Sequence, residues 1–230
     1  MGNNGTDPKH LASAELDALR RAMVEEQIRK RGIGDARVLR AMFAVPRHEF
    51  VPSESAPQAY TDQPLPIGEG QTISQPFMVA AMAAAMELNG IERVLEVGTG
   101  CGYQAAVISM LAREVYTIEA HAARAEAARE RLTRLGYANV QVRASDGTLG
   151  WPEAAPFDAI LVTAAAPAVP PPLVDQLAEG GRLLIPVGTP EFQELRRLRK
   201  RGSALSKEVL YDCRFVPLLG RYGWRDSLAK

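Results

Sequence analysis

Three glycines, Gly98, Gly100 and Gly102, alternate with other residues between an apolar run typical of a strand and an apolar run typical of a helix. Glycine lets the backbone approach a ligand closely, and a helix start beyond the turn offers unpaired N–H donors. Glu96 ends the first apolar run and Glu119 ends the next strand-like run. A carboxylate about twenty positions after such a turn accepts hydrogen bonds from a ribose diol, and two carboxylates disfavour phosphates beside them. This pattern predicts a site for a nucleoside without phosphates; the alternative is that the glycines serve only tight packing of strand against helix.

Other candidate residues carry weaker signals. Asp146 and Gly147 follow a third strand-like run, and an Asp-Gly pair by itself often marks only a turn. We interpret Cys101 as a small turn residue rather than a nucleophile, because no His or Asp stands at a suitable spacing. The three histidines have no His or Cys partner at metal-ligand spacing, so we predict no metal site. The basic run "RRLRKR" at 196–201 is interpreted as a solvated hairpin rather than a nucleic-acid site.

Composition limits the class of protein. A chain of 230 residues with 47% hydrophobic and 23% charged residues is long enough for one α/β domain and is typical of a globular protein. The 27 basic and 27 acidic residues balance, which argues against strong general attraction to nucleic acid or anionic membranes. The two cysteines lack metal-ligand spacing, the start of the chain lacks an apolar signal core, and no apolar run is long enough to span a membrane. We therefore expect a cytoplasmic protein with reduced thiols.

The first ninety residues are predicted to form helices and one loop. Apolar and charged residues recur there at helical spacing, and Pro and Gly interrupt the pattern. The expected elements are a helix over 13–33 with Ser13 as N-cap and Gly32 as stop, a helix over 35–52 broken at Pro46, a surface loop over 53–71, and a helix over 74–88 that starts with Ser74.

From Ile91 onward, strand patterns alternate with helix patterns, which predicts βαβ crossovers and a parallel sheet. The expected elements are strands over 93–98, 114–120, 140–145 and 157–165, helices from Tyr103 and over 123–136, a further helix and strand over 170–188 joined at Gly180 and Gly181, and two strands around a polar turn within 192–219.

Several segments together resemble one family. The glycine turn with its acidic strand ends, and "ASDG" at 144–147, resemble motifs of S-adenosylmethionine-dependent methyltransferases. More specific is "GEGQTISQPFMVAAM" at 68–82, because ordinary methyltransferases do not carry "GQTISQP". With "VPRHEFVP" upstream and "DGTLGWPEAAPFDAILVTAAAP", "GGRLLIPVG" and "RFVPL" downstream, the chain resembles the protein-L-isoaspartate O-methyltransferase family from about Leu19 to Leu218. It departs from the family at Cys101, where Ser is common, and in its tail "GRYGWRDSLAK".

The resemblance implies an α/β fold: a doubly wound, mostly parallel Rossmann-like methyltransferase sheet with helices on both faces and an N-terminal helical extension. Residues 1–90 would form the N-terminal helices and the active-site loop, 91–218 the cofactor-binding core, and 219–230 a C-terminal tail, in a single compact domain. Three placements of the tail stay open: over the substrate groove, against the surface, or disordered.

The resemblance also implies an enzyme that transfers a methyl group from S-adenosylmethionine to the α-carboxylate of L-isoaspartyl residues in damaged proteins and peptides. The product S-adenosylhomocysteine is released, and the ester initiates repair through a succinimide. A carboxylate with a reference pKa near 4 is already an ionised nucleophile at pH 7, so the reaction needs no general base. The expected partners are isoaspartyl-containing proteins and peptides, with no nucleic acid and no membrane, and the expected state is a monomer.

Site residues follow from the same resemblance. Ser74 is the implied catalytic residue, which orients the substrate carboxylate, and its alternative role is a helix N-cap. Val216 and Pro217 are implied to border the peptide. The implied cofactor-binding residues are Gln71, Thr72, Glu96, Gly98, Gly100, Glu119, Asp146 and Gly147.

Three other functions compete with this hypothesis. A relative could modify Asp in one dedicated peptide, with the same chemistry and a different purpose. A non-enzymatic protein could bind a nucleoside only as a structural or sensing ligand, but the intact "QTISQP" segment argues against it. A nucleic-acid methyltransferase is disfavoured because the chain lacks the Asn/Asp-Pro-Pro-aromatic motif expected for amino-group methylation of bases.

Overall fold

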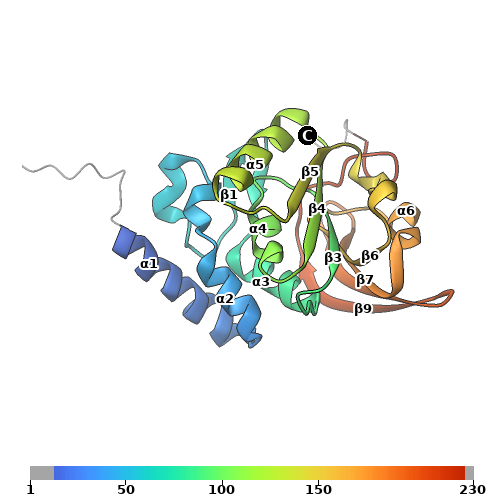
Figure 1. Ribbon diagram of the computed structural model, residues 1–230, viewed down its shortest axis with the longest axis horizontal. Helices are drawn as coiled ribbons and strands as arrows, with labels where there is room; N and C mark the ends of the chain where they lie inside the picture. Colours follow the sequence, from blue (N-terminus) through green and yellow to red (C-terminus); the bar gives the residue numbers. More distant parts are fainter. Residues whose placement is uncertain (1–12, 226–230) are drawn as a thin grey trace, which may run out of the picture.

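The centre of the structure, a computed structural model that describes residues 13–225, is a seven-stranded sheet (Figure 1). Its strand order is β5-β4-β3-β6-β7-β8-β9; the strands from β5 to β7 run parallel, whereas β8 and β9 pair antiparallel. The bounds are β3 Arg93–Val97, β4 Glu114–Glu119, β5 Val140–Ala144, β6 Phe157–Val162, β7 Leu177–Gly188, β8 Gln193–Arg201 and β9 Ala204–Cys213. The predicted mostly parallel sheet is confirmed.

Helices cover both faces of this sheet. Side chains alternate between faces along a strand, so in β6 Ala159 and Leu161 join one apolar core while Ile160 and Val162 join the other. Helices α1 to α5 lie on the first face and α6 on the second (Figure 1). The helices are α1 Ser13–Ala22, α2 Ala36–Ala44, α3 Pro76–Ala85, α4 Tyr103–Ser109, α5 Ala122–Arg134 and α6 Pro171–Asp175, with short helical turns at Met23–Ile28, Arg29–Arg31, Arg47–Phe50, Ser53–Gln58, Gly147–Leu149 and Pro152–Ala154.

The N-terminal helices end where the sequence predicts. The first helical segment stops at Gly32, whose φ of +96° suits glycine and turns the chain away. Helix α2 ends before Pro46, and Asp35 caps its start by accepting hydrogen bonds from two backbone N–H groups. Ser13 is already helical, so the cap position before it lies outside the described residues.

The predicted surface loop over 53–71 is wrong in part. Its second half is strand β1, Leu65–Gly68, which pairs antiparallel with β2, Gln71–Ile73. Leu65 and Ile73 face each other and are both buried, so the hairpin packs on the core although its prolines and glycines are typical of a loop. This hairpin stands directly before α3.

Gly180 and Gly181 do not form the predicted joint between a helix and a strand. Helix α6 ends earlier, and both glycines lie inside β7, where its register against β6 shifts. A Cβ at Gly181 would lie 2.8 Å from the carbonyl oxygen of Ala178, so the bulge admits only glycine there.

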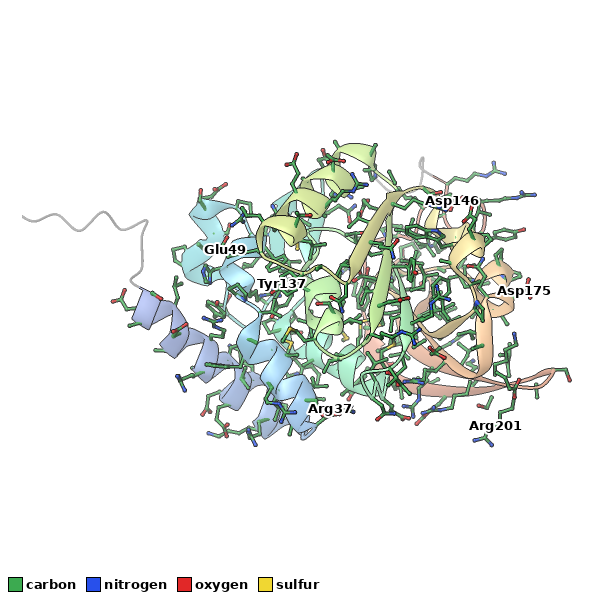
Figure 2. All side chains as sticks on the ribbon, viewed as in Figure 1. Arg37, Glu49, Tyr137, Asp146, Asp175 and Arg201 are labelled. Atoms are coloured by element: carbon green, nitrogen blue, oxygen red, sulfur yellow. The ribbon has the colours of Figure 1, made fainter. Side chains whose placement is uncertain are left out.

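The N-terminal segment shares a core with the sheet. Phe50 is buried and packs edge-on against Tyr103 of α4, with ring centroids 5.4 Å apart. Glu49 forms an ion pair with Arg134 of α5 at 2.9 Å, and Tyr137 packs beside Phe50 (Figure 2). These contacts support the proposal of a single compact domain.

Among residues 13–225, no helix combines the length and the apolar character needed to cross a bilayer. The predictions for the first ten residues and for the last five residues of the tail fall on positions outside the described residues.

If the chain is one domain, Phe50→Ala will destabilise the whole molecule. Removing this buried ring leaves a cavity, and we expect the free energy of unfolding in urea to fall by about 3–5 kcal/mol in one cooperative transition. Met110→Ala, at a side chain 53% exposed, is the matched control and should cost less than about 0.5 kcal/mol. Separate transitions for the N-terminal segment and the sheet would show two independent units.

Candidate active site

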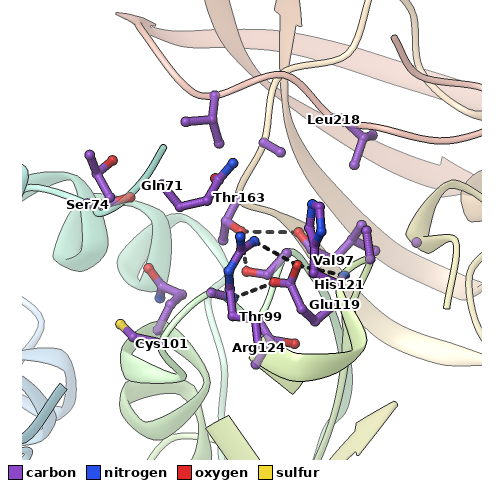
Figure 3. Close-up of a pocket in the computed structure, with 18 of the residues that line it drawn as sticks. Gln71, Ser74, Val97, Thr99, Cys101, Glu119, His121, Arg124, Thr163 and Leu218 are labelled. Carbon is purple, nitrogen blue, oxygen red and sulfur yellow. Dashed lines mark hydrogen bonds and ion pairs between the residues drawn. The ribbon is translucent and has the colours of Figure 1, made fainter. Parts of the chain in front are cut away.

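A hollow opens at the carboxyl ends of β3, β4 and β6, the place where ligands bind in open sheets of this kind (Figure 3). The structure brings nine of the predicted site residues to its lining: Gln71, Thr72, Ser74, Gly98, Gly100, Glu119, Gly147, Val216 and Pro217. Glu96 and Asp146 do not line it.

The glycine turn after β3 packs closely against the end of β6 because its glycines have no side chains. Gly98 has a φ of +103°, and a Cβ there would lie 2.4 Å from the hydroxyl oxygen of Thr163 at the end of β6. That hydroxyl donates a hydrogen bond of 2.6 Å to the carbonyl of Gly98. Gly102 also has a positive φ, +91°, where α4 begins. These glycines therefore do allow the strand and the helix to pack tightly. The backbone of the turn at Gly98 and Gly100 also lines the hollow.

Glu119 is the only acidic side chain of β4 that reaches this hollow in the described part of the chain. It is 4% exposed and accepts hydrogen bonds from the backbone N–H of Gly100 at 2.9 Å and of His121 at 3.2 Å. Arg124 of α5 pairs with the same carboxylate at 3.0 Å (Figure 3). A carboxylate offers about four lone-pair sites, so these donors leave about one for a ligand.

Arg124 also ties down the hairpin beside the hollow. Its second nitrogen pairs at 2.7 Å with Glu69, which stands at the turn between β1 and β2 with a φ of +50°. One guanidinium thus joins Glu119 to the hairpin that carries Gln71 and Thr72.

Glu96 lies beneath the hollow, which corrects its predicted place among the lining residues. It is fully buried, and one carboxyl oxygen accepts a hydrogen bond of 2.5 Å from Thr117, whose hydroxyl also bonds Thr99. Its other oxygen has no hydrogen-bond partner among residues 13–225. Burial raises the pKa of Glu96 to about 8. The hydrogen bond from Thr117 lowers this pKa in part, and the negative charge of nearby Glu119 raises it further. The group is therefore mostly protonated at pH 7.

Asp146 also differs from its predicted place. Its carboxylate accepts the backbone N–H and the hydroxyl of Thr148 and the backbone N–H of Arg221 in the C-terminal tail. The side chain therefore organises the turn, while the next residue, Gly147, reaches the hollow. Figure 2 shows Asp146 at the same end of the sheet as this turn.

Ser74 is not the N-cap of α3. Pro76 is the first helical residue, as its fixed φ favours, and Gln75 takes the cap position without a side-chain bond. Ser74 instead stands at the wall between the first hollow and a second one. The two share five lining residues: Thr72, Ser74, Thr163, Val216 and Pro217.

Sequence reasoning missed several residues at the site. Thr163 follows the apolar run of β6 and could have been found by the same strand-end rule that selected Glu119. Trp224 of the tail lines the second hollow and donates from its indole nitrogen to the carbonyl of Ala165 at 3.0 Å. Arg124 gave no signal, because its role depends on the placement of α5.

Comparisons with known proteins agree with this geometry. The sequence profile of the family described as Protein-L-isoaspartate(D-aspartate) O-methyltransferase (PCMT) matches residues 18–223. The chain belongs to this family. A protein-L-isoaspartate O-methyltransferase from Geobacter metallireducens is 56% identical over 210 residues, which cover 91% of this chain and 97% of the relative.

Solved structures of the family have the same fold. One protein-L-isoaspartate O-methyltransferase superposes with a TM-score of 0.82 at 31% identity, covering 89% of this chain and 67% of that chain. A second, a putative family member from Plasmodium falciparum in complex with S-adenosyl-L-homocysteine, gives 0.76 at 27% identity and covers 87% of this chain and 98% of that chain. The predicted family, fold and enzyme class are confirmed.

The raised pKa of Glu96 predicts a pH dependence of stability in this methyltransferase. Between about pH 4.5 and pH 8 the unfolded state ionises at Glu96 while the folded state keeps its proton, so stability falls as pH rises. Glu96→Gln removes this dependence. Relative to wild type, the variant should gain on the order of 1–4 kcal/mol of unfolding free energy between pH 5 and pH 8.

Urea unfolding at both pH values measures this gain, and Glu130→Gln, at an exposed carboxylate, is the control. Curves for wild type and Glu96→Gln that run parallel with pH would mean that Glu96 is ionised in the folded state.

Proposed function

We propose that this chain transfers the methyl group of S-adenosylmethionine to the α-carboxylate of L-isoaspartyl residues in damaged proteins and peptides. The observation that carries the proposal is the pair of adjoining hollows, because Ser74 stands where they meet. A cofactor in the first and a peptide in the second would bring a methyl group and a carboxylate together beside this hydroxyl.

The residues of the first hollow fit the cofactor. Glu119 would hold the ribose hydroxyls, the open turn at Gly98 and Gly100 would receive the amino-acid end, and Gly147 would lie against the base. The Glu119 carboxylate in the lining favours a ligand without phosphates beside it. A ribose diol needs two acceptor sites where about one is free, so we infer that Arg124 releases Glu119 when the ribose binds. Gln71 and Thr72 would then close over the ligand.

Bound there, S-adenosylmethionine supplies a methyl group on a positively charged sulfur, and the carboxylate oxygen takes the methyl as sulfur keeps the bonding electrons. No proton moves, because a carboxylate is ionised at pH 7. The chain's task is therefore to orient the carboxylate and to exclude water. We assign the orientation to the Ser74 hydroxyl and the border of the peptide to Val216 and Pro217.

The ester product prepares its own repair. Methylation converts the carboxylate into a better leaving group, so the neighbouring backbone nitrogen closes a succinimide without the enzyme. Hydrolysis of that ring returns part of the material to normal aspartate.

We also propose that the enzyme acts as a monomer in the cytoplasm, independently of nucleic acid and membranes. The balanced charge of the chain argues against strong general attraction to nucleic acid or anionic membranes. Cys101 and Cys213 form no disulfide, as is typical of a protein in a reducing compartment. Sedimentation at the mass of one chain tests the first part.

Glu119 and Ser74 are expected to fail in different ways. Glu119→Gln removes the charge that accepts the ribose hydroxyls and should weaken S-adenosylhomocysteine binding by about tenfold or more. Ser74→Ala should leave that affinity within about twofold and lower turnover on an isoaspartyl peptide. Calorimetry and initial rates measure the two effects. Unchanged affinity in Glu119→Gln would remove Glu119 from the cofactor site, and full turnover in Ser74→Ala would leave Ser74 without a role in orientation.

Selectivity tests the reaction itself. In isoaspartate the main chain runs through the side-chain methylene, so the free carboxylate meets the backbone at a different angle and distance than in aspartate. A misplacement of about 1 Å costs roughly a hundredfold in rate, so the enzyme should methylate an isoaspartyl peptide at least about a hundred times faster than its aspartyl twin. Transfer of labelled methyl to matched peptide pairs of several sequences measures this. Equal rates would contradict the proposal, and activity on one sequence alone would favour the dedicated-peptide function.

A further inference from the structure

Arg47 is a buried cation behind the wall that carries Ser74. Its side chain is completely buried, and it donates from Nε to the carbonyl of Ala59 and from Nη2 to the carbonyl of Ser74, each at 2.7 Å. Its Nη1 has no hydrogen-bond partner. The guanidinium lies 4.8 Å from the ring centroid of Tyr103, which lines the first hollow.

No carboxylate of residues 13–225 forms an ion pair with Arg47. The titratable groups that face it are Tyr103, Cys101 and Tyr60. Burial raises the pKa of all three, so they are neutral at pH 7 and do not cancel its charge. Burial also lowers the pKa of Arg47 below its ordinary value, but an arginine keeps its proton at neutral pH.

Two half-buried arginines near backbone carbonyls or the site, Arg182 and Arg124, do have acidic partners. Arg182 also donates to a backbone carbonyl, that of Glu87 at 2.8 Å, but Glu92 lies 3.5 Å away. Arg124 is paired with Glu119. A buried charge without a partner is costly, so its persistence at Arg47 needs a reason.

We propose that Arg47 is a positioning residue that selects an anionic substrate: it holds the Ser74 carbonyl in place and makes the wall behind Ser74 electropositive. The inference rests on the proposed function, since the anion is the α-carboxylate of the isoaspartyl residue. Inside the protein the field of Arg47 is screened less than in water. Two opposite charges about 10 Å apart at an effective dielectric of about 20 change an affinity by roughly tenfold.

The reaction gives this device a kinetic signature. The substrate enters as an anion and leaves as a neutral ester, so a nearby positive charge stabilises the bound substrate more than the transition state. Arg47 should therefore lower the KM for the peptide rather than raise kcat. A residue that only supports the fold would produce no such split.

The test compares an isoaspartyl peptide with the same peptide carrying an α-carboxamide, which is isosteric and uncharged. Equilibrium binding is measured with S-adenosylhomocysteine present, so that no turnover occurs. In wild type the carboxylate peptide should bind more tightly. In Arg47→Gln that preference should fall by roughly tenfold with carboxamide binding unchanged, and the peptide KM should rise while kcat does not fall.

Two variants separate charge from folding. Arg47→Lys keeps the charge and should keep the preference within about threefold. Arg182→Gln removes an arginine that also binds backbone carbonyls, at the opposite end of the sheet, and should lower the melting temperature without changing the preference.

An Arg47→Gln protein that loses both peptides equally, or neither, would overturn the inference. If Arg47→Gln fails to fold, the inference is overturned when folded Arg47→Lys loses the preference for the carboxylate peptide, or when wild type shows no such preference. Wild type that methylates no isoaspartyl peptide would refute the proposed function, whereas normal methylation with an unchanged preference in Arg47→Gln refutes only the role of Arg47.

Discussion

A site that receives an anion beside its own acidic side chains must control where negative charge lies. Glu96 is removed from the balance by burial, which keeps its carboxyl protonated at pH 7. Glu119 is surrounded by two backbone N–H groups and by Arg124. One acidic group is thus neutral and the other is engaged by donors. On the Ser74 side, no carboxylate of residues 13–225 pairs with Arg47. This division suits a reaction in which the two reactants carry opposite charges and the products do not.

The sheet supplies the geometry that makes such control possible. Parallel strands end at one edge, so the residues after β3, β4 and β6 meet there whatever lies between them in sequence. The turn after β3 can come close to β6 only because Gly98 has no side chain to meet Thr163. Thr163 in turn lines both hollows, so the packing that closes the sheet edge also places a hydroxyl at the junction.

The sequence predicted those features that depend on local pattern. The alternation of strands and helices from Ile91 onward gave the parallel sheet, because side-chain periodicity follows directly from backbone geometry. The strand-end rule placed Glu119 at the hollow for the same reason. It placed Glu96 there wrongly, since Glu96 is the fourth of the five residues of β3 and points into the core, not past the end of the strand.

Features that depend on distant contacts were not predictable. The β1–β2 hairpin has the composition of a loop and is stabilised by burial of Leu65 and Ile73. Pro76 overrode Ser74 as the start of α3, and one partner of Asp146, the backbone N–H of Arg221, comes from the tail, 75 residues later in the sequence. Arg47 lies in a recognisable motif, but only the fold shows that its charge has no carboxylate partner within the described part of the chain.

The tail connects the two hollows. Its backbone N–H groups bind Asp146 and Thr148 at the turn that carries Gly147, beside the first hollow, and Trp224 binds the carbonyl of Ala165 and lines the second hollow. Of the three placements left open by the sequence, the described part of the tail therefore packs against the core and borders the second hollow. Because one short segment, 216–224, contributes to the lining of both hollows, a shift at the turn that holds Asp146 would be carried by the backbone to the wall that the two hollows share. The shape of both hollows thus depends on this segment as much as on the sheet.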